Sequence, residues 1–311
     1  MIREIHDIQQ SPRNIILLWD GNYPQPATLR QIQVCLKSII LNEPGAQIHL
    51  FSNVLKEDDL PHEHVALVRW DYQSLGHGTV LDGILPQAGS DWRLWSDLFR
   101  VVALWRWGGT YFDVDDIMVR PLPRMENLIA ACFLTKDQYD RWTPGPVIPG
   151  AYAASTGSLA PSIPFRFGND PLTNFKPRNA FLEKWMGQIP QSAADSWGQT
   201  LPTQIFSSDP AWARRHFNPV PWSDLLYHPY DGGHHPEDQR YSGNSISTHV
   251  RLKEQDYPGC WKKLLGSHGF YLVKNHDFSL HGRSSDEQEL LKWIVQDLWR
   301  RIGGENESFP A

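Results

Sequence analysis

The 311-residue sequence is poor in cysteine, and its three cysteines, Cys35, Cys132 and Cys260, are widely spaced. An odd number of scattered cysteines gives neither a disulfide framework nor the paired spacing of a zinc site, and it is typical of a reducing compartment. The sequence also lacks a run of about 18 apolar residues, which a membrane-spanning helix needs, and its first residues lack the apolar core of a signal peptide. We therefore expect a cytoplasmic protein without a transmembrane segment.

An excess of positive charge is absent as well, because the formal net charge is -6. Indiscriminate binding to nucleic acid is driven by neutralisation of phosphates, so we expect no nucleic-acid partner. The hydrophobic content of 41% and charged content of 21% indicate a folded globular chain rather than a disordered one. Tryptophan, in contrast, is abundant, with 14 residues. Indole faces stack on nucleobases and sugar rings as well as filling cores, which modestly favours a nucleotide or carbohydrate ligand.

The most informative stretch covers residues 95–121, WSDLFRVVALWRWGGTYFDVDDIMVRP. Apolar residues recur at helical spacing as far as Trp105, and this pattern predicts an amphipathic helix. We expect Gly108 and Gly109 to end the helix, because glycine accepts the left-handed conformation of a helix terminus. Residues 110–114 then favour a short strand that leads into three acids.

The three acids are Asp113, Asp115 and Asp116. Because side chains alternate along a strand, we expect Asp113 and Asp115 on one face, with Asp116 on the other face or already in a turn. Neighbouring carboxylates repel each other unless a cation lies between them. Mn²⁺ and Mg²⁺ usually bind through one or two carboxylates and the phosphates of a substrate, so we predict a metal–diphosphate site. A solvated turn is the alternative interpretation.

Asp97 and Arg100 lie three residues apart on the predicted helix and therefore on one of its faces. From this face both side chains can reach a ligand held over the end of the strand. The plainer alternative is an ion pair at the surface, which contributes little to stability.

Residues 96–115 carry the pattern SDLFRxxxLxxxGGxYxDVD, which resembles the signature of the DxD glycosyltransferases with a GT-A fold. This group includes glycosyltransferase family 32, the capsular polysaccharide sugar transferases and the glucosyltransferase domains of large clostridial toxins. The resemblance implies that Asp115 binds the metal directly and that Asp113 contacts the ribose or a metal-bound water. It also implies that Asp97 and Arg100 hold the donor sugar, and that the anomeric configuration is retained.

An apolar run over residues 14–19, NIILLW, predicts a first buried strand. Its end places Leu18 and Trp19 where open α/β sheets present ligands, beyond the carboxyl ends of their strands. The same family resemblance implies that this end of the strand binds the nucleotide and that Trp19 stacks on the uracil of a UDP-sugar. The alternative is that Trp19 is an ordinary core aromatic.

The next segments predict a helix over residues 26–41 and strands over 47–51 and 65–70. Strand, helix and strand in this order favour a right-handed parallel unit, the first half of a nucleotide-binding sheet. We expect residues 117–119 and 129–134 to add strands to the same central sheet.

Prolines and glycines crowd residues 140–179, which excludes long helices and central strands there. We assign this irregular region to the acceptor side. A helix over residues 180–189 and a closing helix from Asp286 complete the chain. The expected fold is one α/β domain with a GT-A type mixed sheet flanked by helices. Residues 1–135 form its nucleotide-sugar half, and residues 136–311 form its acceptor-side half.

In the resembling families a late strand ends in a histidine or asparagine that completes the metal shell, and a small polar residue follows near the diphosphate. His281 is the best positional match in this sequence, with His276 as its rival. Ser284 or Ser285 then follows. The resemblance therefore implies that His281 is the third metal ligand and that Ser284 contacts the donor.

The predicted chemistry is metal-dependent transfer of a sugar from a nucleotide-sugar, of the UDP type, to a glycan or other acceptor. A divalent cation on Asp113, Asp115 and His281 would stabilise the charge that develops on the leaving diphosphate. Asp97 and Arg100 would orient the sugar, so that catalysis needs only positioning and electrostatics.

Four alternatives stay open at this point. The acceptor could be a protein, as in the toxin-like enzymes. The chain could be a DxD metal-dependent phosphohydrolase or a non-enzymatic carbohydrate-binding protein. An inverting transferase would need a base carboxylate, for which Asp116 or an acid in the proline-rich stretch over residues 140–179 is a candidate.

Overall fold

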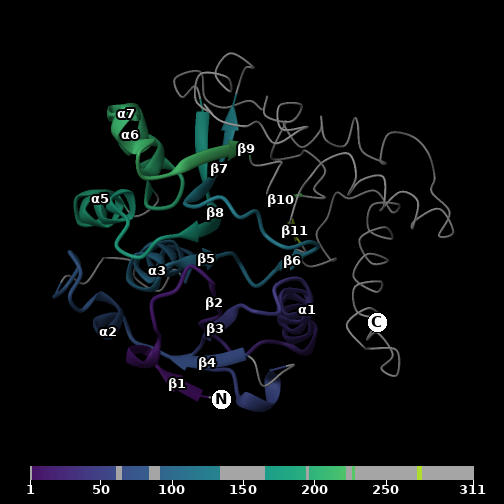
Figure 1. Ribbon diagram of the computed structural model, residues 1–311. Coiled ribbons are helices and arrows are strands. Elements are labelled where there is room, and N and C mark those ends of the chain that lie inside the picture. The colour runs from purple at the N-terminus through teal and green to yellow at the C-terminus, as the bar shows by residue number, and fades with distance from the viewer. Residues whose placement is uncertain are drawn as a thin grey trace, which may run out of the picture.

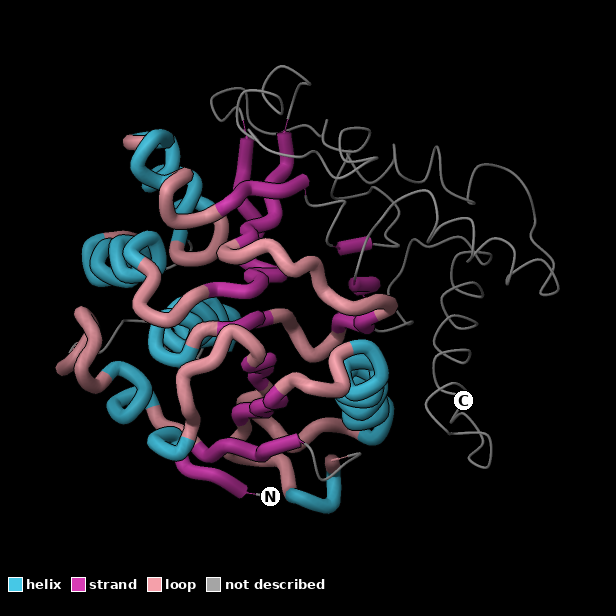
Figure 2. The backbone as a smooth tube through the Cα atoms, in the orientation of Figure 1, coloured by secondary structure: helices cyan, strands magenta, loops and turns pink. Residues whose placement is uncertain are grey.

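The computed structural model describes residues 2–60, 65–83, 92–133, 165–193, 196–221, 226–227 and 272–274. A large sheet runs through the middle of this part of the molecule, and helices cover both of its faces (Figure 1). Helix α1 (Pro26–Asn42) lies on one face, whereas α2 (Tyr72–Gly76), α3 (Trp92–Trp107) and α5 (Ala180–Gln188) lie on the other (Figure 2). The predicted fold class, a mixed central sheet flanked by helices, is confirmed.

Eight strands form the large sheet, and their spatial order is β1 (Ile2–Glu4), β4 (Val65–Arg69), β3 (Gln47–Phe51), β2 (Asn14–Leu18), β5 (Gly109–Tyr111), β8 (Phe165–Phe175), β7 (Leu128–Phe133) and β9 (Asn218–Pro221). From β1 to β5 every neighbouring pair is parallel. Strand β8 is antiparallel to both β5 and β7, and β9 is parallel to β7. A second, three-stranded sheet has the order β10 (Leu226–Tyr227), β11 (Leu272–Lys274) and β6 (Asp116–Met118).

Helices α6 (Thr200–Ser208) and α7 (Pro210–Ala213) follow α5 and lie on the same side of the sheet (Figure 1). Short 3₁₀ turns also occur, namely η1 (Ile5–Asp7), η2 (Glu57–Asp59) and η3 (Ile189–Gln191). None of the helices in the described ranges is both long and apolar enough to cross a membrane.

The alternation of side chains along the parallel strands divides the core into two layers. In β2, Ile15 and Leu17 pack into the layer that contains α1, whereas Ile16 packs into the layer that contains α3. Phe51 at the end of β3 contacts Phe99 of α3, with ring centroids 4.8 Å apart. Both faces of these strands are therefore buried, which explains why their sequences are continuous apolar runs.

Most of the predicted elements are present, but two expectations are wrong. Residues 116–118 form β6 in the second sheet rather than a strand of the central sheet. The proline-rich region contains β8, an 11-residue strand between β5 and β7. Proline is tolerated there because Pro171 lies where the register against β7 shifts, so its missing N–H breaks no regular ladder pair.

Candidate active site

The candidate site lies where the strand order of the large sheet reverses. The chain leaves β2 through α1 toward β3, whereas β5 pairs with the opposite edge of β2, with Ile16 opposite Tyr111. Because β2 and β5 are parallel, their carboxyl ends meet at one edge. Leu18 and Trp19 therefore leave β2 beside the segment that carries Asp113. Open α/β sheets bind their ligands at such a reversal.

Two glycines join α3 to β5, as the sequence predicted. Gly108 and Gly109 have positive φ angles of 70° and 99°. A Cβ atom on Gly109 would lie 2.1 Å from the carbonyl oxygen of Asn14, and one on Gly108 would lie 2.8 Å from the carbonyl oxygen of Phe175. Glycine is therefore needed here for close approach to two neighbouring strands as well as for conformation.

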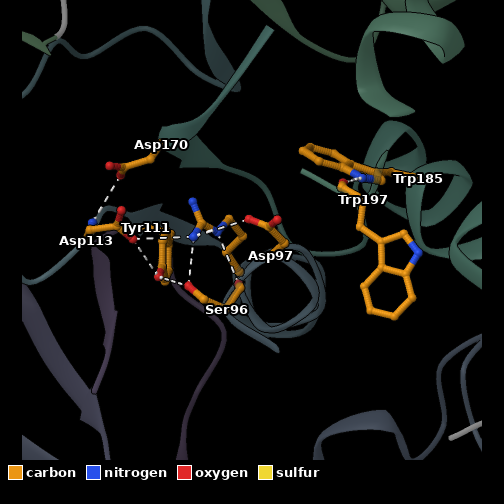
Figure 3. A network of polar contacts seen from close by, with 8 residues as sticks. Ser96, Asp97, Tyr111, Asp113, Asp170, Trp185 and Trp197 are labelled. Carbon is orange, nitrogen blue, oxygen red and sulfur yellow. Dashed lines mark hydrogen bonds and ion pairs between the residues drawn. The ribbon is translucent and has the colours of Figure 1, made fainter. Parts of the chain in front are cut away.

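Arg100 is buried and belongs to a polar network that links α3 to the end of β5. Figure 3 labels the other members of this network, Ser96, Asp97, Tyr111 and Asp113. Its Nη2 atom donates to Ser96 Oγ at 2.7 Å and to Asp113 Oδ1 at 3.4 Å, and it forms an ion pair with Asp97 Oδ1 at 3.5 Å. The Tyr111 hydroxyl donates to the same Asp113 oxygen at 3.0 Å. The Arg100 and Asp97 side chains are 6% and 18% exposed, so their pair is no surface ion pair.

The electrostatic field keeps Arg100 charged. Burial alone lowers the pKa of its guanidinium, but the interactions with Tyr111, Asp113, Asp97 and Asp170 outweigh burial and raise the pKa above its ordinary value. Burial also raises the pKa of Tyr111 well above its ordinary value, so the hydroxyl keeps its proton and remains a donor. The network thus holds one permanent cation among several carboxyl groups.

The acidic segment is a turn and not the end of a strand, which corrects the expected alternation. Strand β5 ends at Tyr111, and the Asp116 amide donates to the Asp113 carbonyl at 3.1 Å. Val114 and Asp115 are the central residues of this turn. Asp116 starts β6 and is fully buried, and its backbone pairs with that of Lys274 in β11.

Asp170 is a site residue that the sequence analysis did not identify. It lies in β8 and is 7% exposed, and its Oδ1 atom accepts a hydrogen bond from the Asp113 amide at 3.1 Å (Figure 3). The signal available in the sequence was an Asp-Pro pair inside the mixed polar and apolar segment FRFGNDPLTNF. That pair was interpreted as part of an irregular loop.

Trp19 occupies the predicted position at the end of β2 and is partly buried. Its amide donates to the Phe51 carbonyl at 2.9 Å, and its ring packs against the core layer that contains α1. Its indole Nε1 is buried and has no hydrogen-bond partner among the described residues. Trp19 is therefore partly a core aromatic, as the alternative proposed, while lying at the edge where a ligand is expected.

The acidic turn fits a hard divalent cation that takes part of its ligands from the substrate. Asp113 and Asp115 supply two carboxylates on one short turn, and Mg²⁺-like ions commonly use one or two carboxylates together with phosphates and water. Among the described residues no group of three or more His, Cys, Asp or Glu side chains could hold a metal ion. The remaining sequence-predicted residues, His281, His276, Ser284 and Ser285, lie outside the described residues.

Comparison with known proteins agrees with the motif. Residues 30–134 match the model of the family described as "Glycosyltransferase sugar-binding region containing DXD motif". This region includes most of α1 and all of α3, β5 and the acidic turn. No curated protein matches the sequence. The matched range contains the pattern over residues 96–115.

Several solved glycosyltransferase structures are similar to the chain. The PaToxG glycosyltransferase has a TM-score of 0.43 at 15% identity, over 92% of this chain and 86% of that chain. The galactosyltransferase LgtC, in complex with donor and acceptor sugar analogs, has a TM-score of 0.36 at 11% identity, over 93% and 99%. GlyE of Streptococcus pneumoniae TIGR4 has a TM-score of 0.33 at 11% identity, over 96% and 64%.

Proposed function

We propose that the chain is a metal-dependent glycosyltransferase that moves a sugar from a nucleotide-sugar, of the UDP type, to a glycan or other acceptor. One observation carries this proposal: Arg100 is buried between Asp97 and Asp113, directly beside the acidic turn. This cluster lies inside the region that matches the glycosyltransferase family model. It also lies where a parallel sheet offers a ligand site.

The donor is proposed to lie along the edge formed by the ends of β2 and β5. Leu18 and Trp19 would contact the nucleobase, since indole faces stack on bases. The diphosphate would lie over the acidic turn, where Asp113 and Asp115 would hold Mn²⁺ or Mg²⁺. His281 and Ser284 are proposed to complete the metal shell and the diphosphate site. Residues 1–135 would thus bind the donor, and residues 136–311 the acceptor.

The residues of the chain would act by positioning and by fixed charge. Asp97 is the more exposed member of the buried pair, and its carboxylate would accept hydrogen bonds from the sugar hydroxyls while Arg100 fixes its orientation. Tyr111 and Arg100 both bond to Oδ1 of Asp113, which limits the rotation of that carboxylate. When bound, the cation would supply Lewis-acid stabilisation of the departing diphosphate. We propose retention of the anomeric configuration.

The test is a screen of sugar nucleotides with the purified chain, with and without Mn²⁺, in which both hydrolysis and transfer are measured. We expect nucleoside diphosphate release only with metal and a loss of at least about 100-fold in Asp115→Ala, as expected when a group acting on developing charge is removed. Asp58→Ala is the matched control, because Asp58 is an exposed acid on η2.

Each rival function predicts a different result. Release of inorganic phosphate from simple phosphoesters would indicate a phosphohydrolase instead. Glycan binding that survives Asp115→Ala, without any turnover, would indicate a carbohydrate-binding protein. A labelled sugar that appears on protein and not on glycan acceptors would identify a protein-modifying transferase.

A further inference from the structure

Strand β8 is irregular at the level of the acidic turn. Its register against β7 passes from Phe167 opposite Ala131 to Leu172 opposite Ile129. Residues 168–171 therefore face the single residue Ala130 of β7, and the register against β5 also shifts beside them. Irregularities of this kind are frequent next to active sites, where they re-aim a side chain.

The side chain that emerges from this irregularity is that of Asp170. The backbone pairing of β5 with β8 ends at Tyr111 opposite Leu172. Two residues further along the chain, the Asp113 amide donates to Asp170 Oδ1 at 3.1 Å. Beyond Tyr111 the backbones of β5 and β8 are no longer paired. The side-chain hydrogen bond from the Asp113 amide to the Asp170 carboxylate links the two segments there instead.

Asp170 is a buried acid, and a buried carboxylate is costly unless charge or hydrogen bonds compensate it. Here both occur, because it accepts from the Asp113 amide and interacts electrostatically with Arg100. Asp170 therefore interacts electrostatically with the same guanidinium that forms ion pairs with Asp97 and Asp113.

The far end of the acidic turn is anchored in a similar way from the opposite face of the sheet. Ser38 of α1 accepts a hydrogen bond through Oγ from the Met118 amide at 2.9 Å, and it donates to the Cys35 carbonyl at 2.6 Å. Asn42 of α1 also donates to the Met118 carbonyl at 2.9 Å, so side chains fix the backbone of segment 113–118 at both ends. Asp170 holds the end that carries the motif.

We propose that Asp170 is a positioning residue for the acidic turn. By fixing the Asp113 backbone, it places the Asp113 and Asp115 carboxylates for a divalent cation, and it acts through Asp113 without contacting the cation itself. This inference rests on the proposed function, because it needs the turn to bind a metal.

The test uses the full chain and three ligand measurements by isothermal titration: Mn²⁺ alone, UDP in EDTA, and UDP with Mn²⁺. For Asp170→Ala we expect Mn²⁺ affinity to fall by about 10- to 100-fold, the usual effect of losing an outer-shell partner of a metal ligand. UDP binding in EDTA should change by less than about threefold, because that measurement does not depend on outer-shell support of a metal. A general loosening of the fold would weaken both.

Asp170→Asn is the informative second variant, because its amide oxygen can accept the same hydrogen bond without the charge. We expect it to recover most of the lost Mn²⁺ affinity. Wild-type Mn²⁺ affinity in Asp170→Ala would overturn the inference. Equal losses in the two variants would also overturn it, because the charge of Asp170 and not its hydrogen bond would then be what matters.

A third variant covers the case in which Asp170→Ala does not fold. Asp170→Glu keeps the charge but moves the acceptor oxygen, so Mn²⁺ affinity should again fall by about tenfold or more. Unchanged affinity in Asp170→Glu would overturn the inference. Failure of the proposed function is distinguishable from all of these, because the folded wild-type chain would then not bind UDP, whatever its affinity for Mn²⁺.

Discussion

Arg100 and Tyr111 hold the same atom from two directions. The guanidinium carbon of Arg100 lies 4.6 Å from the centroid of the Tyr111 ring, and both side chains donate to Oδ1 of Asp113. A cation over an aromatic face is attracted to it, so the pair is stabilised independently of the carboxylate. The first acid of the motif is therefore oriented before any ligand arrives.

Tyr111→Phe tests this orientation without removing the ring. We expect Mn²⁺-dependent activity to fall by about tenfold, which corresponds to about 1.4 kcal/mol, close to the lower limit of about 1.5 kcal/mol for a hydrogen bond to a charged group. The free energy of unfolding should fall by about 1 kcal/mol. The measurements are kcat/KM as a function of Mn²⁺ concentration and urea denaturation.

Tyr72→Phe is the matched control. The Tyr72 hydroxyl is buried without a hydrogen-bond partner among the described residues, and its ring packs edge-on against Trp95. Its removal should leave activity unchanged and the stability equal or slightly higher, because a buried unpaired hydroxyl is unfavourable. Equal activity losses in both variants would show that the Asp113 hydrogen bond is not the cause.

The helix, the two glycines and the start of β5 could be predicted because their determinants are local. Helical spacing of apolar residues marked α3, and two consecutive glycines marked its end. The end of β5 could not be predicted in this way. Its length is set by its pairing with β2 and β8, so Asp113 and Asp115 fall in a turn even though their sequence alternates like a strand.

The role of Asp170 could not be predicted from the sequence for the same reason, because it also depends on non-local strand pairing. It meets the Asp113 amide across 57 residues of chain, and only the register shift of β8 brings it there. Prolines and glycines around it are typical of loops, and nothing in the local pattern shows that the segment pairs with β5. The proximity of Asp97 and Arg100, in contrast, could be predicted, because residues three positions apart on a helix lie on the same face.

Gly109→Ala should be strongly destabilising, because the new Cβ would lie 2.1 Å from the Asn14 carbonyl oxygen at a φ of 99°. We expect the free energy of unfolding to fall by about 3 kcal/mol or more, since both overpacking and a left-handed alanine contribute. Gly78→Ala is the control: its φ is 70° with no atom within 4 Å, so only the strain of about 1–2 kcal/mol remains. Equal losses by urea denaturation would contradict the steric argument.

The lowered pKa of His49, a residue outside the candidate site, leads us to expect that the free energy of unfolding depends on pH. It is 1% exposed in β3, and burial first, then the charge of Arg3, lower its pKa from 6.5 to about 4. The unfolded chain therefore binds the proton more readily, so stability present above pH 6.5 is lost as the pH falls toward 4. Between pH 7 and pH 5 this loss should be about 2 kcal/mol.

Urea denaturation of the wild type and of His49→Gln at both pH values isolates this contribution. The difference between the two proteins in the pH-dependent loss should be about 2 kcal/mol, because glutamine does not titrate. Other groups contribute equally to both proteins and cancel. An identical pH dependence in the two proteins would show that His49 does not titrate with a lowered pKa in the folded state.

Substitutions of Trp19 test whether the sheet edge beside the acidic turn binds a nucleobase. Trp19→Ala should weaken UDP binding in EDTA by about 10- to 100-fold, since stacking of a base on an aromatic side chain contributes about 1–3 kcal/mol. Trp19→Phe keeps a ring and should recover part of the affinity. Trp212→Ala is the control, because Trp212 is also partly buried but lies in α7, where it packs against Phe181 and His216. If Trp19→Ala lowers the melting temperature and leaves UDP affinity unchanged, Trp19 is a core aromatic and the base binds elsewhere.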